Sequence, residues 1–284
     1  MQQETASERG VLSLYQKVYE RKLADLFQRL ADSGQKAIVI KGWASQRLYA
    51  DKLERKPGDL DLIVDPNEKN EFWRDTSGLT DLGLDLHFGP RHLDSMSFED
   101  LLDRSVTVDL EEVPVRVLCQ EDHLRILCVH WLTDGGERKE RLWDIYWAVE
   151  NRSPDFDWQK CLNVVSEKRQ KWIIYTIGLA NKHLDLSLED LPFKEEALDL
   201  PSWLSEAVES RWRKGIPHVP LQHVVWYPKQ LLQQLLKRFP PNPVMALVGF
   251  EGDFDARYRF HYQIGFIFKQ ALPSFRRVYR AVRQ

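Results

Sequence analysis

Cysteine is scarce in this chain, and its placement excludes two kinds of architecture. The sequence of 284 residues contains only Cys119, Cys128 and Cys161. Their spacing does not match a zinc-binding motif, and any disulfide scheme would leave one of them unpaired. A disulfide-stabilised secreted domain is therefore excluded. We expect the thiols to be small buried hydrophobic groups in a reducing compartment.

Long apolar runs are also lacking. No stretch reaches the roughly 18 apolar residues that a membrane-spanning helix requires. Residues 1–10 are polar and do not contain the apolar segment of a signal peptide. We therefore expect a cytoplasmic protein with no membrane partner. The sequence contains no internal repeat and no low-complexity segment.

The chain carries little net charge, which excludes a general attraction for polyanions. The formal net charge is −3, and 43% hydrophobic with 29% charged residues is typical of a globular chain long enough to bury a core. Charge of one sign gathers only at the end, where seven Lys or Arg follow Asp255, the last acidic residue. This basic tail can attract phosphates, an acidic partner or nucleic acid. A solvated helix face also explains it.

Hydrophobic periodicity predicts a small sheet followed by helices. Apolar residues at helical spacing predict a first helix over residues 11–31. Short apolar or alternating runs predict strands over residues 37–40, 60–64, 84–88, 106–110 and 113–117, the last two as a hairpin or paired edge strands. Further helices are expected over residues 44–50, 67–76, 121–132, 139–150, 158–167 and 171–180. The fold class is α+β, with a mixed-sheet domain over residues 1–120 and a helical domain over residues 121–284.

Two aspartates in the second predicted strand are the main candidate site. Asp59 and Asp61 are two residues apart, and such residues point to the same face of a strand. Two carboxylates so close repel each other unless a positive charge lies between them. Mg²⁺ prefers a few carboxylates together with phosphate oxygens and water. We therefore expect these residues to hold a metal ion, although paired acids at a strand end can also simply face solvent.

Residues near the preceding strand are candidates for binding phosphate. Gly42 lies between a predicted strand and helix, where a missing side chain lets phosphate approach the backbone, and Ser45 in the first helical turn could add a hydroxyl group. Lys41 could neutralise phosphate charge, or form a salt bridge at the strand end. Arg55 could bind phosphate through two hydrogen bonds, or pair with nearby Glu54 or Asp51.

A third carboxylate lies in the predicted strand over residues 84–88. Asp85 stands among apolar residues, where an acid is costly unless it is paired or binds a metal. It could bridge two metal ions or activate an attacking hydroxyl group. His87 would share its face of the strand and could touch a substrate, although such a histidine is more often structural.

These segments resemble the uncharacterised nucleotidyltransferase family of the polymerase-beta-like superfamily. The motifs that carry the resemblance are Lys41-Gly42-Trp43-Ala44-Ser45, Arg55-Lys56-Pro57-Gly58-Asp59-Leu60-Asp61 and Leu84-Asp85-Leu86-His87-Phe88. Glu121-Asp122 with His130, and Trp143-Asp144 beyond, resemble the helical segment of that family. The resemblance covers residues 10–160 well and the tail only loosely.

The resemblance implies a nucleotidyltransferase core followed by a helical domain. In that family, Asp59 and Asp61 would ligate Mg²⁺, Asp85 would complete the catalytic and metal site, and Gly42 and Ser45 would meet the triphosphate. The implied reaction is transfer of a nucleoside monophosphate from a nucleoside triphosphate, with ATP the expected donor, to a hydroxyl or phosphate, releasing pyrophosphate. The acceptor could be a small molecule, a peptide, a protein or an RNA end.

An alternative is a non-catalytic module that keeps the fold, such as an antitoxin-like or peptide-maturation partner. Trp43 favours this alternative, because the superfamily usually has a small residue after Gly42, and a tryptophan could crowd the phosphates or point into the core. The three retained acids favour the enzyme. His123 and His130 are interpreted as packing residues, and Asp144 as an interdomain hydrogen-bond acceptor.

Overall fold

Five strands form one mixed sheet in the computed structural model, which describes residues 6–56, 58–67, 72–73, 83–90, 94–216 and 219–283. The strands are β1 (Ala37–Ile40), β2 (Leu60–Val64), β3 (Leu84–Phe88), β4 (Val106–Leu110) and β5 (Val113–Val117). They lie in the order β3-β2-β1-β5-β4. The β1–β2 and β4–β5 pairs are antiparallel, whereas β2–β3 and β1–β5 are parallel. The predicted mixed sheet is confirmed, and β4 with β5 forms the predicted hairpin.

By packing, the chain forms two compact units. The first comprises Met1–Leu127 and Asp144–Ser166, and the second comprises Cys128–Trp143 and Glu167–Gln284. The sheet belongs to the first unit. The division into domains of residues 1–120 and 121–284 stays a prediction.

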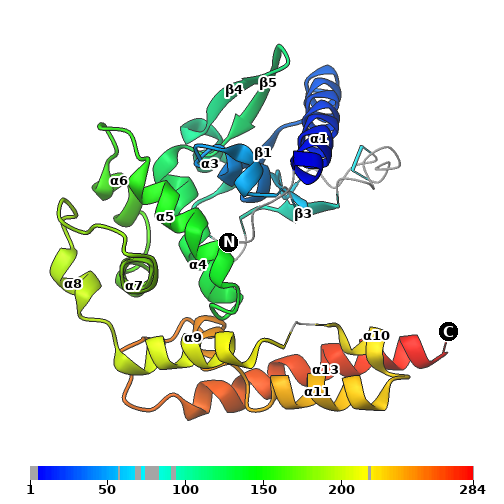
Figure 1. The fold of residues 1–284 in the computed structure, drawn as a ribbon, viewed down its shortest axis with the longest axis vertical. Helices are drawn as coiled ribbons and strands as arrows, with labels where there is room; N and C mark the ends of the chain where they lie inside the picture. Colours follow the sequence, from blue (N-terminus) through cyan, green and yellow to red (C-terminus); the bar gives the residue numbers. More distant parts are fainter. Residues whose placement is uncertain are drawn as a thin grey trace. The chain divides into compact units, whose positions relative to one another are not determined.

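The two faces of the sheet have separate cores because strand side chains alternate. Leu60, Leu62 and Val64 of β2 pack with helix α1 (Ala6–Asp32), beside the strands in Figure 1. Ile63 points to the other face, where α3 (Phe98–Arg104) and the first turns of α4 (Gln120–Thr133) cover it. Asp61 therefore lies on the same face of β2 as Ile63.

Other elements of the first unit are short. Helix α2 (Gly42–Gln46) follows β1 directly, and a 3₁₀ turn over Lys52–Glu54 precedes β2. Helix α6 (Trp158–Leu162) is capped by Asp157, whose side chain accepts hydrogen bonds from two backbone N–H groups of the first turn. It ends earlier than the predicted helix over residues 158–167. The predicted helix over residues 67–76 lies for the most part outside the described residues.

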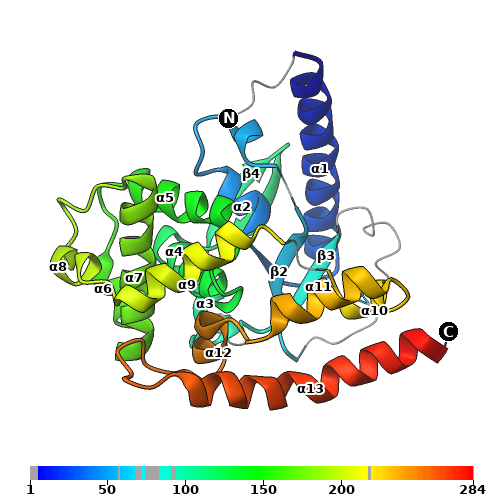
Figure 2. The same ribbon diagram turned by 60° about the horizontal axis from the view of Figure 1, so that its bottom comes forward.

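The described residues of the second unit form helices joined by turns and loops, as predicted (Figure 2). From Glu167 on, its helices are α7 (Glu167–Leu184), α8 (Lys194–Leu198), α9 (Ser202–Lys214), α10 (Leu221–Val224), α11 (Pro228–Arg238), α12 (Pro243–Val248) and α13 (Phe260–Arg283). Its earlier segment contains a 3₁₀ turn over Lys139–Arg141, which leads to α5 (Leu142–Glu150), and α5 belongs to the first unit from Asp144 on. Phe254 centres an aromatic core, with ring centroids 5.6 Å from Trp203 and 6.2 Å from Trp172. Among the described helices, none has the length and apolar character needed to cross a membrane.

Candidate metal centre

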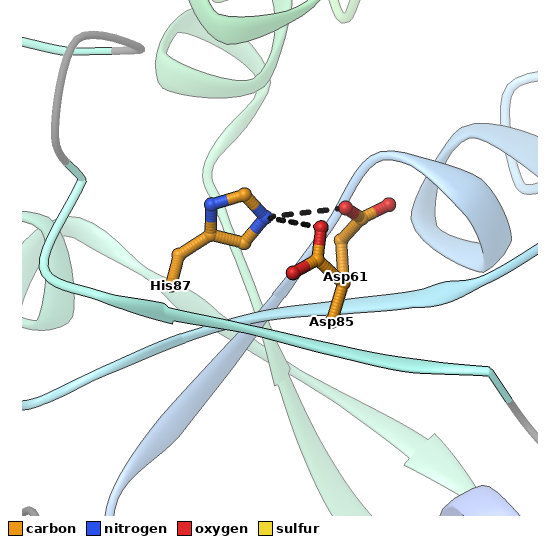
Figure 3. Close-up of side chains that lie close together, drawn as sticks. All are labelled: Asp61, Asp85 and His87. Carbon is orange, nitrogen blue, oxygen red and sulfur yellow. Dashed lines mark hydrogen bonds and ion pairs between the residues drawn. The ribbon is translucent and has the colours of Figure 1, made fainter. Parts of the chain in front are cut away.

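Strand register brings together two acids that are 24 positions apart in the chain. Asp61 of β2 is paired with Asp85 of β3 in the parallel ladder, and the next pair on that face is Ile63 with His87. Because side chains two residues apart share a face, Asp61, Asp85 and His87 all project from the side that α3 and α4 cover. Figure 3 shows the three side chains converging from the two neighbouring strands.

The imidazole of His87 lies between the two carboxylates. His87 Nε2 is 3.2 Å from Asp61 Oδ1 and 3.4 Å from Asp85 Oδ2. One ligand atom from each of the three residues lies within 4.8 Å of the other two. The side chains of His87 and Asp61 are only 11% and 15% exposed, whereas that of Asp85 is 59% exposed. His87 and Asp61 are thus largely shielded from solvent, whereas Asp85 is accessible to it.

Lys41 supplies the positive charge next to this centre. Its Nζ lies 2.7 Å from Asp61 Oδ1, and its side chain is 8% exposed. Its backbone has φ 54° and ψ −150°, a region that residues with a Cβ rarely adopt and that is held only where the surrounding structure imposes it. Of the two predicted roles for Lys41, the structure places it in the strand-end salt bridge, with Asp61.

The charge state of Asp61 follows from these neighbours. Burial opposes ionisation of its carboxyl group, but the hydrogen bond with His87 and the charge of Lys41 together outweigh burial. They hold the pKa of Asp61 below its ordinary value. Asp61 is therefore a carboxylate at neutral pH, as a metal ligand must be.

Asp59 lies apart from the three-residue group. It precedes β2, and its carboxylate lies against Gly83, where a Cβ would be 2.7 Å from Asp59 Oδ1. Its backbone oxygen lies against Gly42, where a Cβ would be 2.9 Å away. The absent side chain at Gly42, which has φ 35°, thus makes room for the Asp59 carbonyl group. Because Asp59 is exposed, its carboxylate remains open to solvent.

Ser45 is fully buried and faces a histidine. Its Oγ lies 3.4 Å from His123 Nε2, which brings α2 and α4 together. Burial lowers the pKa of His123 to about 4, and the charges of Arg47 and Arg55 act in the same direction. His123 is therefore neutral at pH 7 and serves the packing role predicted from sequence, with Ser45 as its polar partner.

We expect acid to destabilise the fold through His123. Its folded pKa is below the unfolded value, so the unfolded chain binds more protons between about pH 4 and pH 6.5, and stability falls as the pH drops through this window. A shift of this size corresponds to a loss of about 2 kcal/mol between pH 7 and pH 5. Urea unfolding of wild type and His123→Gln at both pH values tests this. An equally steep pH dependence in the variant would contradict it.

Arg55 is occupied by a buried carboxylate. Its Nε donates to Asp144 Oδ1 at 2.8 Å, its Nη2 to Asp144 Oδ2 at 3.1 Å, and its Nη1 to the Lys56 carbonyl at 2.7 Å. Tyr49 also donates to Asp144 Oδ1, at 2.8 Å. Burial raises the pKa of Asp144 above its ordinary value, against the effect of Arg55 and Tyr49. This geometry favours a role for Arg55 in holding the segment before Asp59 rather than in binding phosphate.

The partner of Arg55 was not predicted from sequence. The ion-pair alternative to phosphate binding named Glu54 or Asp51, but Asp51 caps the 3₁₀ turn at Leu53 and pairs with Arg9. Asp144 belongs to the same compact unit as Arg55, although the predicted boundary near residue 120 separates the two residues in the sequence. The one sequence signal was an acid inside the apolar run of residues 142–149, where an unpaired carboxylate would be costly.

Trp43 points into the core. Its side chain is 2% exposed within the hydrophobic cluster under α1, and its Nε1 donates to Glu20 Oε1 at 3.1 Å. Of the two predicted orientations, crowding the phosphates or packing in the core, the structure has the second. The indole is therefore not what fills the space at Gly42, which the Asp59 carbonyl group approaches instead.

Comparison with known proteins bears out the family resemblance. Residues 69–185 match the family described as uncharacterised nucleotidyltransferase, a segment that includes Asp85, His87 and Asp144 but begins after Asp61. An antigenic nucleotidyltransferase-like protein from Paracoccidioides brasiliensis is 15% identical, with a TM-score of 0.46 over 64% of this chain and 93% of its own. No curated protein matches the sequence.

Proposed function

We propose that this protein is a metal-dependent nucleotidyltransferase that transfers a nucleoside monophosphate from a nucleoside triphosphate, with ATP the expected donor, to an acceptor hydroxyl or phosphate. The observation that carries the proposal is the convergence of Asp61, Asp85 and His87 beside Lys41 on one sheet face. The family match over residues 69–185 supports the same class of reaction. The acceptor could be a small molecule, a peptide, a protein or an RNA end.

The donor set suits a divalent cation. Asp61 and Asp85 offer carboxylate oxygens from paired positions of adjacent strands, and Asp85 is open to solvent, so incoming phosphate oxygens and water can complete a coordination shell. Asp59, exposed and two residues before Asp61, is proposed as a further ligand for Mg²⁺ carried by the triphosphate. A bound ion would neutralise charge on the phosphates and lower the pKa of the attacking group.

The protein's own groups have separate roles in this proposal. The acceptor oxygen forms a bond to the α-phosphorus, and the bond to the pyrophosphate oxygen breaks. Asp85, the exposed carboxylate, orients an acceptor hydroxyl and takes its proton. Lys41 is placed to interact with phosphate charge when a cation replaces it at Asp61. Because little covalent chemistry is needed, positioning and charge neutralisation carry most of the catalysis.

Core packing of Trp43 weakens the case for a non-catalytic module. That alternative rested on a tryptophan beside Gly42 that could obstruct phosphates, and the indole is buried under α1 instead. The largely buried Lys41–Asp61 pair, with the imidazole of His87 beside it, also forms an arrangement of titratable groups of the kind that clusters at functional sites. Both observations favour the enzyme.

Calorimetric titration of ATP, GTP, CTP and UTP with Mg²⁺ into the purified protein tests the proposal. We expect metal-dependent binding of at least one nucleotide, and loss of that binding in an Asp59→Asn/Asp61→Asn double variant. Circular dichroism establishes that both proteins are folded. If folded wild type binds no nucleotide, the catalytic proposal fails and the non-catalytic module replaces it.

A further inference from the structure

The donor set of the centre is not the one that Mg²⁺ prefers. Mg²⁺ is bound by oxygen and keeps several of its waters, whereas imidazole nitrogen suits first-row transition metals such as zinc, copper, iron and nickel. Carboxylates also suit Mn²⁺. One imidazole and two carboxylates from Asp61, Asp85 and His87 therefore form a mixed nitrogen and oxygen set.

The two distances from His87 Nε2 fit coordination of one ion by the imidazole and the two carboxylates. Neighbouring ligand atoms of an octahedral ion with bonds of about 2.1 Å are about 3 Å apart. His87 Nε2 lies 3.2 Å from one carboxylate oxygen and 3.4 Å from the other. A purely structural histidine would need one acceptor for its Nε2 proton, whereas here two carboxylates approach the same nitrogen.

We infer that Asp61, Asp85 and His87 form one three-donor site for a first-row divalent transition metal, which binds Mn²⁺ in preference to Mg²⁺. This deepens the proposed function and rests on it for the role of the ion, although metal binding can be measured alone. His87 is the specificity-determining ligand, because it supplies the only nitrogen of the set. Coordination through Nε2 requires the ring proton on Nδ1.

Lys41 competes with the ion. Its ammonium group lies 2.7 Å from the same Asp61 oxygen that approaches His87, and it is nearly buried. An ion bound to that oxygen must repel Lys41 at short range or displace its side chain. Removal of the ammonium group in Lys41→Met should therefore strengthen Mn²⁺ binding, whereas removal of a merely structural salt bridge would not.

The test is calorimetric titration of Mn²⁺ and of Mg²⁺ into the full chain, in wild type, His87→Gln and His223→Gln. His223 is an exposed histidine of α10 in the second unit and serves as the matched control. We expect wild type and His223→Gln to bind Mn²⁺ at least about tenfold more tightly than Mg²⁺. In His87→Gln, an amide oxygen replaces the nitrogen, and the affinity for Mn²⁺ should fall to that for Mg²⁺.

Spin-echo spectroscopy of the Mn²⁺ complex adds a direct readout of the ligand. Modulation from ¹⁴N of a coordinated imidazole is expected in wild type and absent in His87→Gln. If that variant does not fold, the wild-type spectrum still tests for nitrogen coordination, and the Lys41→Met titration still tests for an ion at Asp61. Equal affinities for the two ions, a preference that survives in folded His87→Gln, or a spectrum without nitrogen would overturn the inference.

The outcome is separable from that of the proposed function. Nucleotide binding with Mg²⁺ but without a preference for Mn²⁺ would overturn the metal assignment and leave the nucleotidyltransferase proposal standing. A His87-dependent preference for Mn²⁺ in a protein that binds no nucleotide would support the metal site and remove the enzyme proposal.

Discussion

Asp61→Asn is expected to abolish binding of divalent metal at the centre and to lower nucleotidyl transfer by about a hundredfold to a thousandfold. Asp61 is the point where the site's interactions meet, since its Oδ1 contacts both Lys41 and His87. A neutral amide removes the negative charge that a cation needs there and leaves the ammonium group of Lys41 nearly buried without its partner. Calorimetry with Mn²⁺ and Mg²⁺, and a pyrophosphate-release assay with the bound nucleotide, measure the two effects.

Two further aspartates provide the controls. Asp65→Asn changes an acid just beyond β2 whose carboxylate accepts from the Asn67 backbone N–H, so it should leave metal binding unchanged. Asp59→Asn should weaken nucleotide binding with Mg²⁺ while leaving the Mn²⁺ preference in place, because Asp59 lies outside the three-residue group. Undiminished metal binding by folded Asp61→Asn would remove the centre as the metal site.

Arg125→Met is expected to lower the free energy of unfolding by about 3–5 kcal/mol. Arg125 is fully buried and joins two carboxylates that are also fully buried: its Nη2 lies 2.6 Å from Asp94 Oδ2, and its Nη1 lies 2.8 Å from Asp122 Oδ1. Asp122 keeps a second partner in Arg104, but Asp94 would lose its guanidinium. A buried carboxylate without a cation is strongly unfavourable, and the apolar methionine cannot replace the hydrogen bonds. Urea unfolding monitored by circular dichroism measures the loss.

An exposed arginine shows how much of that effect depends on burial. Arg21 pairs with Asp25 and Glu111 on the surface of the first unit, with 70% of its side chain exposed. Exposed ion pairs contribute little, so Arg21→Met should change stability by less than about 1 kcal/mol. Similar losses in both variants would mean that the Arg125 network is not the buried anchor that its geometry indicates.

Local patterning was enough to predict the sheet. The bounds predicted for all five strands coincide with β1 to β5, because each strand is a short apolar or alternating run. The end of α1 was also predicted, because a glycine, Gly34, follows its last residues. In the structure Gly34 has φ 68°, a backbone conformation that favours glycine. Predictions were less accurate where helices are short: α2 begins at Gly42 and ends at Gln46, where residues 44–50 were expected. Single-turn helices are set by packing more than by propensity.

Partners in the site depended on tertiary structure. Arg55 and Asp144 are 89 positions apart, and no local rule predicts that they meet. His87 could be placed on the face of Asp85 by strand alternation, but its approach to Asp61 required the parallel register of β2 and β3. For Asp59, strand alternation was misleading. It predicted that Asp59 would project with Asp61, but β2 begins at Leu60, so Asp59 lies before the strand. The turn before the strand directs Asp59 toward Gly83.

The sequence by itself determined which segments become strands, which acids lie on them, and the family that the chain resembles, because these depend on short-range periodicity and motif spacing. The tertiary structure alone decided which of those acids converge, that Lys41 neutralises Asp61, and that Trp43 packs inward. Each of these depends on strand register or on long-range packing. Both are set by the burial of the whole hydrophobic surface, which no local stretch of sequence specifies.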